Sequence, residues 1–149
     1  MKKVILIVTL LLISAMMFGA TVASLTITGT VNSSIAITVT EMNLPLDLTV
    51  SSTVQVGLVT EKANTGYTIG ISSLNSGKLI GDTLSEELTY TATYGGDSIV
   101  LSSTVQEVVS DGSKTSGVDK ALIISYTIVE YTLSPNSYRD TLTFTIVAK

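Results

Sequence analysis

The stretch LTYTATYGGD, residues 88–97, decides the fold class. Its apolar side chains alternate with threonines, and a period of two is that of a β-strand with one buried face. Glycine accepts a positive φ without steric cost, so Gly95-Gly96-Asp97 predicts a hairpin turn. Residues 98–102 then form the returning strand of a hairpin.

The same alternation recurs along the chain, and no helical period appears after the first two dozen residues. Residues 67–72 and 141–146 are clear strands, whereas residues 46–50 alternate over a shorter span. Residues 122–128 have apolar side chains on both faces, which predicts a central strand. Residues 110–120 are rich in Ser, Gly, Asp and Lys and predict an exposed loop.

Turn signals at short, regular spacing are typical of two packed antiparallel sheets. We therefore expect an all-β chain with about nine strands. The expected architecture is an immunoglobulin-like Greek-key β-sandwich, and exchange of a strand between subunits could complete it.

Residues 1–23 predict a cleaved signal peptide, and residues 24–149 predict a single domain. Lys2 and Lys3 precede an apolar run, and small residues favour cleavage after Ala23. A retained transmembrane anchor stays an alternative, because the apolar run is just long enough to span a bilayer. A type IV pilin leader is disfavoured, since strand-like alternation begins at once instead of a long helix.

Composition narrows the functional classes. The formal net charge is −4, and it falls to −6 once Lys2 and Lys3 leave with the leader, which argues against binding to nucleic acid or anionic lipid. The chain has no Cys and no His. It therefore lacks disulfides, thiol nucleophiles, the usual general base and the commonest metal ligand. The sequence predicts a protein that is not an enzyme and has no cofactor or metal.

Three sets of side chains suggest a site, and each has a simpler interpretation. Glu86 and Glu87 are adjacent on a strand and point to opposite faces, so we interpret them as surface charges. Asp111 and Asp119 lack the dense oxygen ligands of a calcium loop and belong to a solvated segment. Several tyrosines are in phase with Ile and Leu of their strands, which predicts packing rather than a sugar-stacking face. These are Tyr67, Tyr90, Tyr94 and Tyr126.

Residues 24–31, SLTITGTV, alternate in the same way and form the candidate interaction site. Leu25, Ile27 and Val31 share one face, and Gly29 leaves its position on that face without a side chain. A terminal strand can complete its own sheet or that of another chain. Residues 24–31 are thus either a donor strand or an ordinary first strand, and the short break at Asn32-Ser33-Ser34 favours the latter.

Two parts of the chain resemble known families. The middle of bacterial pilin-type subunits resembles segments 56–59, 64–69, 72–79 and 88–96. The C-terminal strand of the spore coat U family is similar to residues 137–146, SYRDTLTFTI. That family includes secreted subunits of archaic chaperone–usher fibres. The resemblance implies an immunoglobulin-like domain that lacks one strand. The N-terminal extension of the next subunit fills the resulting groove, and a chaperone fills it before assembly. Such subunits commonly carry a disulfide, which this chain cannot form.

The sequence therefore predicts a non-enzymatic structural subunit of a secreted surface fibre, pilus or coat that assembles by β-strand complementation. It would pass through the periplasm to the cell surface and contact the membrane only through its signal peptide. Expected partners are copies of itself or related subunits, a periplasmic chaperone and an outer-membrane usher, but not nucleic acid. The alternative is an extracellular or periplasmic β-sandwich module that binds carbohydrate or protein.

Overall fold

The computed structural model of the chain describes residues 23–129 and 132–149. Within them the chain is all-β, with ten strands and no helix, and paired strands run antiparallel. The predicted signal peptide, residues 1–23, lies outside the described residues except for Ala23. Across the described ranges, we find no helix with the length and apolar character needed to span a membrane.

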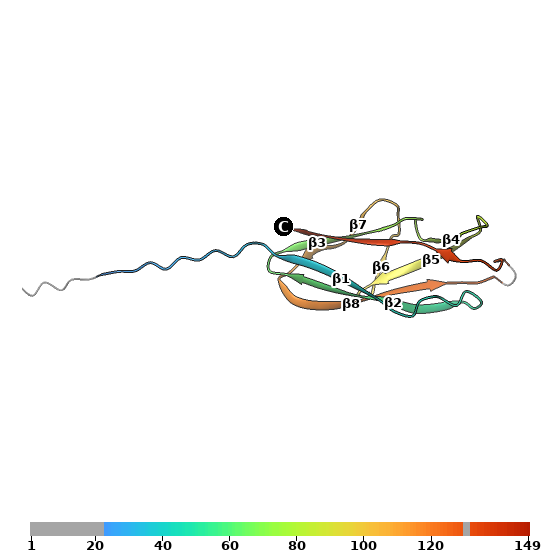
Figure 1. Cartoon of the computed structure of the whole chain (residues 1–149), viewed down its shortest axis with the longest axis horizontal. Helices are drawn as coiled ribbons and strands as arrows, with labels where there is room; N and C mark the ends of the chain where they lie inside the picture. The colour runs from blue at the N-terminus through green and yellow to red at the C-terminus, as the bar shows by residue number, and fades with distance from the viewer. Residues whose placement is uncertain (1–22, 130–131) are drawn as a thin grey trace, which may run out of the picture. The chain divides into compact units, whose positions relative to one another are not determined.

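The strands form a curled seven-stranded sheet and a second, three-stranded sheet. The larger sheet has the order β1-β2-β8-β5-β4-β9, with β6 paired to β5, and the smaller has the order β10-β3-β7. Figure 1 shows β2 and β8 in one layer and β3 with β7 in the other. The larger sheet contains β1 (Ile35–Glu41), β2 (Ser52–Ala63), β4 (Lys78–Gly81), β5 (Glu87–Tyr94), β6 (Asp97–Ile99), β8 (Thr115–Tyr126) and β9 (Tyr138–Arg139). The smaller sheet contains β3 (Tyr67–Ser73), β7 (Gln106–Gly112) and β10 (Leu142–Ala148).

The β5–β6 hairpin and the central position of β8 confirm two predictions. Gly95 and Gly96 have φ values of 61° and 100° and close the hairpin, in which Tyr94 pairs with Asp97. Strand β8 lies between β2 and β5, so its two long edges are both hydrogen-bonded. The apolar residues on both faces of its second half are those expected of such a central strand.

The exposed loop predicted at residues 110–120 is wrong. Strand β7 continues to Gly112, and β8 begins at Thr115 and pairs with β2, where Asp119 lies opposite Thr60. The Thr60 hydroxyl donates to the Asp119 carboxylate at 2.6 Å. In the first half of β8 the backbone is paired, but most side chains are exposed. Because no face of this half is buried, its sequence shows no alternation of apolar residues.

Residues 46–50 alternate but form no strand, which is a second difference from the sequence pattern. The Asp47 carboxylate accepts hydrogen bonds from the Thr49 N–H at 2.9 Å and from its hydroxyl at 2.6 Å. The hydroxyl bond, followed by the backbone bond, lowers the pKa of Asp47. This local turn competes with strand pairing. Leu46 and Leu48, on either side of Asp47, therefore lie outside both sheets.

The core consists of three clusters, two of which lie between the two sheets. Val59 of β2, Ile71 of β3 and Tyr94 of β5 pack in one cluster and are each at most 3% exposed. A neighbouring cluster joins Tyr67 and Ile69 of β3 to Ala63 of β2. A third lies at the opposite end of the larger sheet and contains Leu79, Leu88, Tyr90, Ala92, Ile124 and Tyr126. The first two clusters therefore join the two sheets, whereas the third is built from the larger sheet and from loop residues such as Leu46 and Leu133.

Candidate functional site: an apolar groove between two sheet edges

The candidate site lies between the edge strands β1 and β10. Among the described strands, β1 pairs only with β2, and β10 pairs only with β3. At one end the two strands pack together, where Ile35 and Ile37 join the cluster that also contacts Phe144 and Ile146. Within residues 23–129 and 132–149, each strand keeps one edge of N–H and C=O groups without a sheet partner, which is a template for another strand.

A groove opens between the other ends of these strands. Its first hollow has a volume of about 270 Å³ and is walled by Val39 of β1 and by Leu142 and Phe144 of β10. The remaining lining is mostly apolar and comes partly from the core and partly from the rim. It includes Glu41, Leu44, Leu46, Val56, Leu79, Tyr90, Leu122, Ile124, Asp140 and Thr141.

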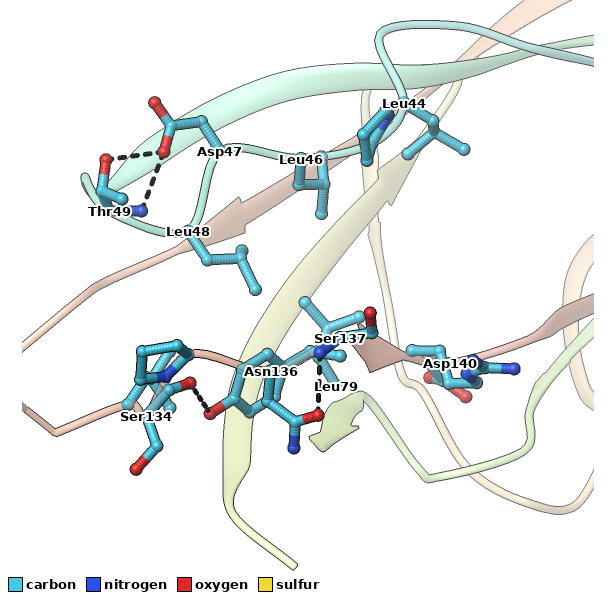
Figure 2. A pocket seen from close by; sticks show the side chains of 15 residues that line it. Leu44, Leu46, Asp47, Leu48, Thr49, Leu79, Ser134, Asn136, Ser137 and Asp140 are labelled. Atoms are coloured by element: carbon cyan, nitrogen blue, oxygen red, sulfur yellow. Dashed lines mark hydrogen bonds between the residues drawn. The ribbon is translucent and has the colours of Figure 1, made fainter. Parts of the chain in front are cut away.

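A second hollow of about 780 Å³ continues the first, because the two share Leu44, Leu46, Leu79 and Asp140. Its walls are residues 44–49 on one side and residues 133–140 on the other. Figure 2 shows Leu46 and Leu48 directed across the hollow toward the segment that contains Ser137. We call the two hollows together the edge groove. The apolar side chains at its rim are accessible, since Val39 is 43% exposed and Leu44 is 50% exposed.

Asp140 fixes the junction of the two hollows. Its carboxylate accepts from the Ser73 hydroxyl and the Tyr90 hydroxyl, both at 2.6 Å. It also accepts from the backbone N–H of Asn75 at 2.9 Å and of Thr141 at 2.7 Å. These bonds tie the start of β10 to β3 and β5, so the groove wall is held rigidly at this point.

Glu86 fixes the far wall. Its carboxylate accepts from the Ser134 N–H at 2.8 Å, the Ser134 hydroxyl at 2.7 Å and the Tyr138 hydroxyl. The Tyr138 bond, ahead of the two from Ser134, lowers the pKa of Glu86, and the Glu86 acceptor raises the pKa of Tyr138. Glu86 stays partly exposed, as the interpretation as a surface charge requires, and its hydrogen bonds give it a structural role in addition. Glu87 does lie at the surface, where it pairs with Lys78 at 2.6 Å.

The predicted site residues lie in an exposed stretch. Residues 23–34 belong to no strand. Leu25, Ile27 and Val31 are 87%, 86% and 89% exposed, and a Cβ at Gly29 would meet no atom within 4 Å. Three large apolar side chains are thus exposed on one face of this stretch, and Gly29 takes the fourth position of that face.

The prediction that four tyrosines pack rather than stack on a sugar is confirmed, because all four are buried. Tyr67 and Tyr94 donate to the fully buried Glu61 carboxylate, and Tyr126 donates to the Asp47 carbonyl at 2.8 Å. Desolvation and then the Glu61 acceptor raise the pKa of Tyr67 to about 12. These rings form no exposed face for stacking on a sugar.

The raised tyrosine pKa predicts alkaline unfolding. Tyrosine in the unfolded chain ionises near pH 10, whereas folded Tyr67 does so at about 12. Its contribution to stability is complete below pH 10 and is lost as the pH rises from about 10 to about 12. Tyrosinate absorbance and far-ultraviolet circular dichroism should therefore change together. Ionisation of Tyr67 near pH 10 with the fold intact, assigned by comparison with Tyr67→Phe, would contradict this.

Asp111 and Asp119 are not brought together as ligands. Asp111 accepts from the Lys149 ammonium at 3.2 Å, and Asp119 accepts from Thr60. Across residues 23–129 and 132–149, no group of three or more acidic side chains could hold a metal ion.

No protein-family model matches the chain, and comparison with curated proteins gives no match.

Proposed function

We propose that this chain is a structural subunit of a secreted surface fibre, pilus or coat that assembles by β-strand complementation. Residues 24–31 of one copy fill the edge groove of the next. In this proposal the fold is an immunoglobulin-like Greek-key sandwich that lacks one strand, and the added strand would lie between β1 and β10.

The observation that carries the proposal is the edge groove itself. It is lined mostly by apolar side chains and flanked by two strands that each have one edge unpaired in the described part of the chain. The same chain displays Leu25, Ile27 and Val31 at near-complete exposure. The groove has unpaired strand edges and apolar walls, and residues 24–31 have the alternation of a strand but no core to pack against. The two features of this molecule are therefore complementary.

The chemistry of β-augmentation fits both features. Backbone groups of an added strand hydrogen-bond to the flanking edges, and every second side chain enters the groove. In residues 24–31 those positions are Leu25, Ile27, Gly29 and Val31. The groove offers Leu44, Leu46 and other apolar contacts. Threonines at the intervening positions would face away, where hydroxyl groups are solvated.

The proposal includes the route of the chain. Residues 1–23 direct secretion, a periplasmic chaperone covers the edge groove during transit, and an outer-membrane usher assembles copies at the cell surface. The similarity of residues 137–146 to the spore coat U family supports this route. An exposed apolar groove also supports it, since such surfaces aggregate unless they are covered.

Deletion of residues 24–31 tests the proposal. The chain that begins at Ser24 should form polymers, and the chain that begins at Asn32 should stay monomeric in light scattering after size-exclusion chromatography. Leu44→Asp places a charge in the groove and should also reduce assembly. Val100→Asp is the matched control, because Val100 is 72% exposed and does not line the groove. Equal polymerisation of all four proteins would contradict the proposal.

A further inference from the structure

Asn64, which follows β2, holds the chain just before β1. Its Oδ1 accepts from the Ser34 N–H at 2.7 Å, and its Nδ2 donates to the Asn32 carbonyl at 2.7 Å. Its own N–H donates to the Ser34 carbonyl at 3.0 Å. We call these three hydrogen bonds the Asn64 bracket.

The bracket keeps residues 32–34 in line with β1. The register pairs Ile35 with Ala63, so the bond between Asn64 and Ser34 extends the same ladder by one residue. None of residues 32–34 has a positive φ. The chain therefore enters β1 without a turn, although the polar sequence Asn32-Ser33-Ser34 is of the kind that forms turns.

A turn at this point is what a subunit would need in order to fill its own groove. A three-residue hairpin loop at 32–34 gives a register in which Ile27 lies opposite Val39 and Leu25 lies opposite Glu41. Residues opposite one another in an antiparallel pair share a face, and Val39 and Glu41 line the edge groove. The sequence of residues 24–31 thus suits self-filling as well as exchange, and a feature of the fold must decide between them.

Two features oppose the turn. Three-residue hairpin loops commonly place their last residue in the left-handed region. That residue is Ser34, and a non-glycine residue there lowers the population of the turn by about tenfold. The turn would also break the Asn64 bracket, whose two side-chain bonds contribute roughly another tenfold or more.

We propose that Asn64 is a positioning residue that disfavours self-filling. The edge groove of each copy is then left open for residues 24–31 of a second copy of the chain. This inference rests on the proposed strand complementation and concerns only which copy supplies the strand. Loss of the bracket would shift the balance toward closed monomers, in which residues 25–31 pair with β1 of their own subunit.

Two variants test the inference by different routes. Asn64→Ala removes both side-chain bonds of the bracket. Ser34→Gly keeps every backbone atom of the bracket but removes the steric cost of the turn, so it serves even where Asn64→Ala folds poorly. Thr65→Ala is the control, since its hydroxyl bonds to the Lys149 carbonyl at 3.4 Å and not to residues 32–34. Each is made in the chain that begins at Ser24.

Light scattering at matched concentrations gives the polymer fraction, and hydrogen exchange gives the protection of amides 25–31. Asn64→Ala and Ser34→Gly should each raise the monomer-to-polymer ratio about tenfold. Amides 25–31 of these monomers should be protected independently of concentration, and the monomers should not bind an added peptide of residues 24–31. Thr65→Ala should match the wild type.

Polymerisation of both variants at the wild-type level would overturn the role of Asn64 and leave strand complementation intact. A wild-type monomer with protected amides 25–31 would overturn it too, because the groove would then be self-filled despite the bracket. A wild-type monomer in which amides 25–31 exchange freely, and whose groove binds no added peptide, would overturn the proposed function and this inference with it.

Discussion

Glu61→Ala is expected to lower the free energy of unfolding by about 3 kcal/mol, because it leaves buried partners without their acceptor. Glu61 is 0% exposed and accepts from the hydroxyls of Tyr67 and Tyr94. The Lys120 ammonium lies 3.1 Å from the same carboxylate and 5.2 Å from the centre of the Tyr94 ring. One carboxylate thus joins β2, β3, β5 and β8 across the core.

The expected loss divides unequally among these partners. Each buried hydroxyl left without an acceptor costs about 1–3 kcal/mol. The Lys120 side chain is 28% exposed and can turn toward water, so its share is smaller. Glu61→Gln keeps an acceptor and the volume, and it should cost less than the alanine.

Urea unfolding followed by circular dichroism measures these changes. Glu107→Ala is the matched control, since Glu107 is an exposed carboxylate on β7, and it should alter stability by less than about 0.5 kcal/mol. A Glu61→Ala variant as stable as Glu107→Ala would show that the buried cluster does not hold the two sheets together.

Asp140→Ala is expected to cost about 2–3 kcal/mol and to deform the edge groove. The substitution removes the common acceptor of Ser73, Tyr90 and the backbone N–H groups of Asn75 and Thr141. Tyr90 is 6% exposed, so its hydroxyl cannot readily replace the lost bond with water. The start of β10 would then be free to move relative to β3.

Two measurements separate these effects. Urea unfolding gives the stability loss, with Asp111→Ala as control, because Asp111 is 91% exposed and its pair with Lys149 contributes little. Polymer formation under conditions where Asp140→Ala is fully folded reports on the groove and should fall below the wild-type level. A folded variant that assembles normally would show that Asp140 supports the fold but not the groove.

The sequence predicted the strands whose apolar side chains face the core. Residues 88–94 and 122–128 carry the period of two because one or both of their faces are buried. The first half of β8 was missed for the opposite reason: its backbone pairs with β2 while most of its side chains stay in water. Residues 46–50 show alternation without pairing, because Asp47 and Thr49 close a local turn.

The edge groove could not be predicted from any single stretch. Its lining comes from segments far apart in the sequence, such as Leu44, Leu79, Ile124 and Phe144. An unpaired strand edge is a property of the sheet order and leaves no local pattern. The partner of residues 32–34 is likewise distant in the sequence, since they are hydrogen-bonded to Asn64, some thirty residues away. The display of apolar residues at 25, 27 and 31 was, by contrast, visible in the sequence.

Binding of a peptide with the sequence of residues 24–31 to the chain that begins at Asn32 tests strand complementation most directly. We predict saturable binding by calorimetry, with slowed hydrogen exchange at the free edges of β1 and β10. A peptide with Asp in place of Ile27 should bind at least tenfold more weakly, because a carboxylate would enter an apolar groove. Absence of binding, or equal binding of the two peptides without protection of either strand, would contradict the account.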